Sequence, residues 1–209
     1  MVDFAHTALI VVDVQNDFCP GGALAVPEGD RVVPVMSRLA ERMAAAGAPI
    51  VATRDWHPAE SRHFVTAGGP WPVHCVAGTP GAAFHGGLRL PDGVIVVSKG
   101  QAPDEDGYSP FDGQTDAGDR LADALRARQV THLVVGGLAT DYCVKATVLD
   151  ARRLGFEVDV VRDGIRAVDL RPGNAERALG QMCEAGARLV DSAEIAPPVS
   201  ARRPSPAPG

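Results

Sequence analysis

Gly136-Gly137-Leu138-Ala139-Thr140-Asp141-Tyr142-Cys143-Val144 joins a predicted strand to a predicted helix. The preceding run, 131–135, reads Thr-His-Leu-Val-Val and favours a β-strand that the two glycines end. We predict a helix from about Thr140 onwards, which places Cys143 in its first turn. There the helix dipole and the unpaired N–H groups would favour a thiolate and could hold an oxyanion. Taken alone, the segment also fits a buried cysteine that packs a helix against a sheet.

The alternation of strand and helix extends along most of the chain. Apolar runs that predict buried strands lie at 8–12, 50–53, 94–98, 156–161 and, more briefly, 187–190. Segments of helical composition lie at 31–46, 116–128 and 174–185, and the helix that carries Cys143 should extend to about residue 154. No helix or strand is predicted for 58–92 or 100–114. This order predicts an α/β fold with a parallel sheet covered by helices on both faces.

The composition is that of a globular protein. The 209 residues are 45% hydrophobic and 22% charged, which fits one domain, and we place that domain at 1–196. Residues 197–209 are rich in proline and are expected to be disordered. A net charge of −6 gives no bulk attraction for nucleic acid or for an anionic membrane, so neither is an expected partner.

Cysteine spacing and the N-terminal sequence both favour a cytoplasmic location. The four cysteines are widely spaced and form no C-x-x-C motif, which favours reduced thiols over a disulfide framework. The first residues lack the basic start and apolar run of a signal peptide, and no apolar stretch approaches the roughly 18 residues of a membrane span.

Three reactive side chains share one position relative to the predicted strands. Asp13, Lys99 and Cys143 each follow the carboxyl end of a strand, where parallel sheets build their sites. If those strands are neighbours, the carboxylate could take the thiol proton and the ammonium would stabilise both anions. Taken singly, Asp13 could be a carboxylate that stabilises a turn, and Lys99 could be a solvent-exposed lysine at a strand end. Because all three residues follow strand ends, we favour a catalytic arrangement.

A candidate metal site lies in the irregular region. Asp55 and His57 fall on one side of an extended segment, and His63 and His74 follow. One carboxylate and three imidazoles suit Zn²⁺, Mn²⁺ or Fe²⁺, although a turn with unrelated surface histidines is the alternative. Aromatic side chains on loops at the same end of the sheet could wall a pocket for a flat ring, or could serve only in packing: Phe18, Trp71, Tyr108 and Tyr142.

In combination, these motifs resemble the nicotinamidase/pyrazinamidase branch of the isochorismatase-like cysteine hydrolases. The similarity extends from residue 8 to about 190 and rests on the following elements: Val12-Asp13-Val14-Gln15-Asn16-Asp17-Phe18, Asp55-Trp56-His57, His63-Phe64, Trp71-Pro72-Val73-His74-Cys75-Val76, Gly78-Thr79-Pro80-Gly81, Lys99-Gly100, Tyr108-Ser109-Pro110-Phe111 and Gly137-Leu138-Ala139-Thr140-Asp141-Tyr142-Cys143-Val144. The resemblance implies a three-layer α/β/α fold with a six-stranded parallel sheet. It also implies deamidation of nicotinamide to nicotinate, with pyrazinamide as a further substrate and a homo-oligomer as a possible assembly.

The resemblance also implies a role for each site residue. Cys143 is the nucleophile, Asp13 the proton shuttle and Lys99 their charge partner. The N–H groups of Ala139 and Cys143 form an oxyanion hole beside a cis Leu138–Ala139 peptide. One divalent metal, which is zinc, iron or manganese, is bound by Asp55, His57, His63 and His74 and anchors the pyridine nitrogen. Phe18, Trp71 and Tyr108 enclose the ring, and Tyr142 stands where relatives often carry histidine.

Two other functions fit parts of the sequence. A metal-free relative would hydrolyse another small amide, an N-carbamoyl compound or an isochorismate-like vinyl ether, and would not need the metal residues together. A binding protein on the same scaffold would not need all three of Asp13, Lys99 and Cys143.

Overall fold

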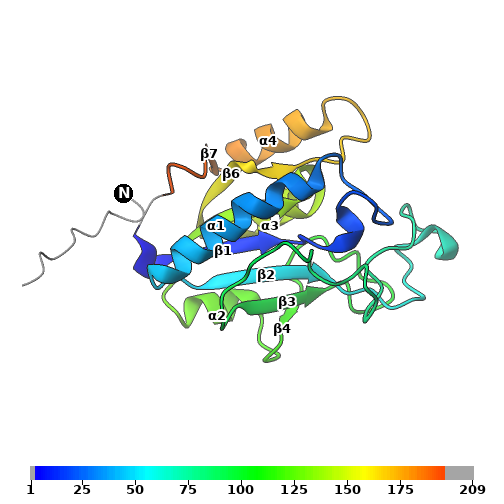
Figure 1. Ribbon diagram of the computed structural model, residues 1–209, viewed down its shortest axis with the longest axis horizontal. Coiled ribbons are helices and arrows are strands. Elements are labelled where there is room, and N and C mark those ends of the chain that lie inside the picture. The colour runs from blue at the N-terminus through cyan, green and yellow to red at the C-terminus, as the bar shows by residue number, and fades with distance from the viewer. Residues whose placement is uncertain (1–2, 196–209) are drawn as a thin grey trace, which may run out of the picture.

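One twisted sheet forms the centre of the computed structural model, which describes residues 3–195 (Figure 1). Its strands are β1 (Thr7–Val12), β2 (Ile50–Asp55), β3 (Ile95–Lys99), β4 (Gln114–Thr115), β5 (His132–Leu138), β6 (Glu157–Arg166) and β7 (Arg188–Val190). Their order in the sheet is β4-β3-β2-β1-β5-β6-β7. β1 lies in the middle with all of its residues buried, as its unbroken apolar sequence predicts.

The predicted strand number is wrong by one. The sheet has seven strands, and the additional strand, β4, pairs antiparallel with β3 at the sheet edge. β4 has only two residues, in a stretch that was predicted to be irregular, so it carries no alternation from which a strand could be recognised. The six predicted strands are all present and pair in parallel.

Helices cover both faces of the sheet, as predicted. They are α1 (Val32–Ala45), α2 (Leu121–Arg126), α3 (Lys145–Arg153) and α4 (Asn174–Glu184). The buried side of α1 packs with Leu9 and Val11 on one face, while α2, α3 and Met182 of α4 contribute to the core that contains Ile10 and Val12 on the other. The prediction of a helix over 116–128 is too long, because the chain turns at 115–119 and α2 begins only at Leu121.

The carboxyl ends of four neighbouring strands bring the predicted site residues to one edge. Asp55 and Lys99 are paired in register as the last residues of β2 and β3, and Asp13 directly follows β1. Cys143 lies on a single π-helical turn, Thr140–Val144, that connects β5 to α3. Close contact of β5 with β1 requires a glycine at 137, since a Cβ there would lie 2.0 Å from the Val12 carbonyl oxygen.

Three sequence predictions concern the tail, the domain boundary and the assembly. The proposed tail at 197–209 lies outside the described residues, and the domain boundary at 196 and the homo-oligomer stay predictions. Within residues 3–195, no helix has the length and apolar character needed to cross a membrane.

Candidate active site

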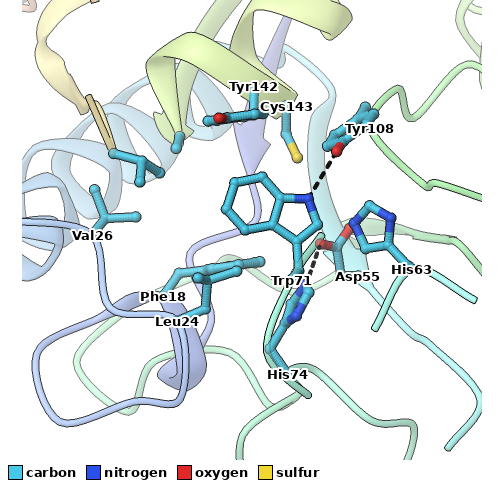
Figure 2. Close-up of a pocket in the computed structure, with 12 residues that line it drawn as sticks. Phe18, Leu24, Val26, Asp55, His63, Trp71, His74, Tyr108, Tyr142 and Cys143 are labelled. Carbon is cyan, nitrogen blue, oxygen red and sulfur yellow. Dashed lines mark hydrogen bonds and ion pairs between the residues drawn. The ribbon is translucent and has the colours of Figure 1, made fainter. Parts of the chain in front are cut away.

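A pocket opens at the carboxyl edge of the sheet and encloses roughly 370 Å³ of empty space, part of it open to solvent. Figure 2 shows aromatic, acidic and imidazole side chains arranged around it. Its lining residues are Phe18, Leu24, Val26, Asp55, His63, Trp71, His74, Tyr108, Ala139, Tyr142, Cys143 and Val168. The pocket therefore joins the strand-end residues to the aromatic and histidine residues of the 58–92 segment.

Four buried side chains form a group that we call the charge cluster, with Lys99 at its centre: Asp13, Asp55, Lys99 and Cys143. The Lys99 ammonium lies 2.7 Å from Oδ2 of Asp13, pairs closely with Oδ1 of Asp55, and is 3.5 Å from the Cys143 sulfur. It also donates to the Gly107 carbonyl. Burial disfavours the ammonium, but the two carboxylates more than offset this and raise its pKa well above the usual value. Lys99 therefore stays protonated.

Asp13 is fully buried and has an unusual backbone conformation for a non-glycine residue, with φ of +47°. Its Oδ1 accepts a hydrogen bond of 2.6 Å from the Thr53 hydroxyl. Burial raises the pKa of Asp13 to about 6, although Lys99 and the Thr53 hydrogen bond both act to lower it. A carboxyl group with such a pKa can accept and return a proton near neutral pH.

The surroundings of Cys143 favour the thiol, whereas its position at a helix start favours the thiolate. Burial raises the pKa of the Cys143 thiol well above its usual value, and the nearby carboxylates raise it further, whereas Lys99 acts in the opposite direction. One carboxylate oxygen of Asp13, one of Asp55 and the sulfur of Cys143 lie within 4.8 Å of one another. The proton on the sulfur therefore has an acceptor close by. The Leu138–Ala139 peptide is cis.

Asp55 connects the charge cluster to three histidines, His57, His63 and His74, that we call the histidine cluster. Its Oδ2 lies 3.7 Å from Nε2 of His57 and 4.0 Å from Nε2 of His74, while Oδ1 contacts Lys99. Burial alone would raise the pKa of Asp55, but Lys99 and His57 together lower it below its usual range. The carboxylate is therefore ionised and faces both clusters.

The histidine cluster has the donor atoms of a metal site. One nitrogen from each ring lies within 4.8 Å of the other two, and all three rings are buried. Nδ1 of His57 contacts the Gly100 carbonyl at 3.0 Å and Nδ1 of His74 contacts the Pro72 carbonyl at 2.7 Å. A carbonyl oxygen only accepts, so Nδ1 is the donor in both contacts and Nε2 is the atom available to a metal. The buried Nε2 of His57 has no hydrogen-bond partner among residues 3–195. Three imidazoles beside one carboxylate suit a borderline divalent metal.

Burial lowers the pKa of both His63 and His74, despite the opposing effect of Asp55. The rings are therefore neutral and able to bind a cation near neutral pH. These residues, together with Asp55 and His57, are the candidate metal ligands that were predicted from the sequence.

The aromatic residues form the walls of the pocket. Trp71 donates a hydrogen bond of 2.9 Å from Nε1 to the Tyr108 hydroxyl and meets Tyr142 edge to face at 4.9 Å between ring centroids. Phe18 approaches the pocket from the side opposite Cys143, next to Leu24 (Figure 2). The ring of Tyr142 stacks against that of Tyr108, with 6.0 Å between the ring centroids. Tyr142 therefore belongs to the pocket wall, although relatives often carry histidine at this position.

Sequence reasoning missed several residues that support the site. Gln15 is fully buried and donates to the Asp55 carbonyl at 2.9 Å, while its Oε1 accepts from the Asp55 N–H at 2.8 Å. Thr53 holds Asp13, as described above. Both lie in or beside motifs that were quoted from the sequence, so their positions carried a usable signal. Val26 and Val168 come from irregular segments and carried none.

Comparisons with known proteins identify the family of the chain. The Isochorismatase domain family matches residues 7–194. The chain is 42% identical to the nicotinamidase of Escherichia coli (strain K12), with 90% of this chain and 95% of that one covered. The pyrazinamidase of Pyrococcus horikoshii in complex with zinc has a TM-score of 0.82 at 47% identity, covering 89% of this chain and 99% of that one. PnC1 from L. infantum in complex with nicotinate has a TM-score of 0.82 at 35% identity, covering 92% and 96%.

The chain therefore belongs to the isochorismatase family, in the branch of amidohydrolases that contains the nicotinamidases. The family predicted from the sequence motifs is confirmed, and so is the prediction that the protein is an enzyme.

Proposed function

We propose that the protein deamidates nicotinamide to nicotinate and ammonia through a thioester on Cys143, and that it also hydrolyses pyrazinamide. The observation that carries this proposal is the meeting of a buried thiol, a lysine and two carboxylates at the inner end of a pocket walled by aromatic rings. The relatives named as nicotinamidases and pyrazinamidases support the choice of substrate.

The first half of the reaction forms the thioester. Asp13 takes the proton from the Cys143 sulfur as the sulfur attacks the carboxamide carbon. Lys99 stabilises the negative charge as it passes from Asp13 to the sulfur, because its ammonium pairs with the carboxylates and contacts the sulfur. The N–H groups of Ala139 and Cys143 stabilise the tetrahedral oxyanion, a contribution worth about 10²–10³ in rate per donor in acyl-transfer enzymes. The carbon–nitrogen bond then breaks, and the ammonia leaves with the proton from Asp13.

The second half restores the enzyme. Asp13 accepts a proton from water as the water oxygen attacks the thioester carbon, and the carbon–sulfur bond breaks to release the carboxylic acid. The proton returns from Asp13 to the Cys143 sulfur. The pKa of about 6 suits Asp13 to both transfers.

Asp55, His57, His63 and His74 would hold one divalent metal, which would supply a Lewis-acidic anchor for the ring nitrogen of the substrate. Zinc is bound by the P. horikoshii pyrazinamidase, while iron and manganese also suit these ligands. Phe18, Trp71 and Tyr108 would enclose the ring, and Tyr142 would close the wall beside them.

The second candidate is hydrolysis of another small amide or an N-carbamoyl compound without a metal. The histidine cluster argues against it, because three buried imidazoles beside an ionised carboxylate have no use in such a reaction.

Ammonia release from nicotinamide, measured with and without a chelator, tests the proposal. We expect release that the chelator abolishes and that added divalent metal restores. Release from N-carbamoyl compounds but not from nicotinamide would reverse the order of the two candidates.

A further inference from the structure

Asp106 is the one acidic side chain within 4 Å of His63 among residues 3–195, and the mechanism above does not use it. Its Oδ1 lies 3.4 Å from Nδ1 of His63, a nitrogen that is buried and has no other partner in that part of the chain. The Asp106 side chain is 74% exposed, so a change of rotamer can close the remaining distance. The arrangement differs from those of His57 and His74, whose Nδ1 atoms contact backbone carbonyls.

We propose that Asp106 is a positioning residue for the metal, which accepts a hydrogen bond from Nδ1 of His63 and so directs Nε2 of that ring to the ion. This inference rests on the proposed metal site. A carboxylate in this position fixes the tautomer and orientation of a ligating imidazole and makes it more basic. The three rings of the histidine cluster would then each be held through Nδ1.

The backbone around Asp106 is anchored, which keeps the carboxyl group of this residue within reach of His63. The next residue, Gly107, accepts a hydrogen bond from Lys99, and Tyr108 accepts one from Trp71. Gly100 and Gly107 pack so closely that a Cβ on Gly107 would lie 2.8 Å from the Gly100 Cα. Three successive residues of this loop therefore contact the histidine cluster, the charge cluster and the pocket wall, respectively.

Zn²⁺ binding to the metal-stripped full chain tests the proposal, measured by competition with a chromophoric chelator. We expect Asp106→Asn to weaken Zn²⁺ binding on the order of 10-fold, since loss of such a partner typically reduces metal affinity 10–100-fold. Asp104→Asn is the matched control, because Asp104 is an exposed aspartate on the same loop and the substitution removes the same charge. We expect it to bind Zn²⁺ within about twofold of the parent, as surface charges are largely screened. Asp106→Glu should recover most of the affinity.

Equal affinities of Asp106→Asn and Asp104→Asn would overturn the inference, whether both matched the parent or both were weakened. A lower unfolding midpoint of metal-free Asp106→Asn than of Asp104→Asn would also overturn it, because the residue would then act on the fold. A parent that binds no Zn²⁺ would instead refute the proposed metal site itself. The two failures are therefore distinguishable.

Discussion

The charge cluster and the histidine cluster meet at Asp55, but the chain builds them in different ways. Asp13, Asp55 and Lys99 lie at or just past the ends of adjacent parallel strands, and their positions follow from the register of the sheet. The histidines lie in irregular segments, where hydrogen bonds from Nδ1 fix the rings of His57 and His74. The first arrangement depends on the fold and contributes to it, whereas the second lies in loops outside the sheet.

The two clusters also differ in how completely their polar groups are paired. In the charge cluster every ionised group has a buried partner, so the cluster is already assembled in the protein alone. In the histidine cluster the buried Nε2 of His57 is unsatisfied within the described chain, and such an atom is costly unless something binds it. The two clusters should therefore respond differently to substitution and to metal removal.

Cys143→Ala should have the largest effect on activity. Removing the attacking sulfur should lower the rate of ammonia release at least about 10³-fold, as loss of the nucleophile does in other acyl-transfer enzymes. Zn²⁺ affinity should stay at the parent level, because the thiol is outside the histidine cluster. Both quantities are measured on the same preparation. Residual activity above a few per cent of the parent would show that Cys143 is not the nucleophile.

Lys99→Met should have the largest effect on stability. It leaves two buried carboxylates without their cation, and breaking a buried ion pair in this way typically costs about 3–5 kcal/mol. Denaturant unfolding of the metal-free protein at pH 7 measures the free energy of unfolding. The control is Lys145→Met, which replaces a half-exposed lysine outside both clusters and should change stability by about 0.5 kcal/mol or less. Equal losses for the two variants would contradict the claim that the charge cluster supports the fold.

His57→Ala should have its main effect on metal binding. Loss of a direct ligand should weaken Zn²⁺ binding on the order of 100-fold or more, since loss of an outer partner alone costs 10–100-fold. His85→Ala is the control, because His85 lies in the 58–92 segment outside the histidine cluster, and among residues 3–195 its ring takes part in one hydrogen bond, from the backbone N–H of Gly87. Competition with a chromophoric chelator measures both affinities. Unchanged binding in His57→Ala would exclude the histidine cluster as the metal site.

The contrast between the clusters also explains what could be predicted from the sequence. The apolar runs predicted the six parallel strands, and therefore the edge where Asp13, Asp55 and Lys99 lie. The edge strand β4 could not be predicted, because Gln114 and Thr115 form no pattern. The histidines could be proposed only from their residue type and the family motifs, since no periodicity governs a loop.

Some properties of the site depend on three-dimensional surroundings and have no local sequence signal. The helix start predicted a thiolate at Cys143, but burial and two carboxylates raise the pKa of the thiol instead. Val168 lines the pocket because Asp141 accepts hydrogen bonds from the backbone of Val168 and Asp169, at 3.0 and 2.9 Å. Such a contact joins two segments that lie far apart in the chain.

Thr53→Val should have the smallest effect, and it tests whether Asp13 is the proton shuttle. The pKa of Asp13 is about 6, and the Thr53 hydroxyl favours its ionised form through a hydrogen bond of 2.6 Å. Only ionised Asp13 can take the thiol proton, so kcat/KM should fall about 10-fold per pH unit below this pKa. Removing the hydrogen bond should raise the pKa and move the acid limb upward by about one pH unit, the equivalent of 1.4 kcal/mol.

The direction of that shift distinguishes Asp13 from the histidines. The profile is measured with saturating metal, so that protonation of the histidine cluster does not contribute, and the apparent pKa belongs to the charge cluster as a whole. Thr7→Val is the matched control, since Thr7 is also buried but lies at the opposite end of β1 and donates to the Asp3 carbonyl. We expect its acid limb to coincide with that of the parent. An acid limb that stayed in place in Thr53→Val would mean that a group other than Asp13 controls the proton transfer.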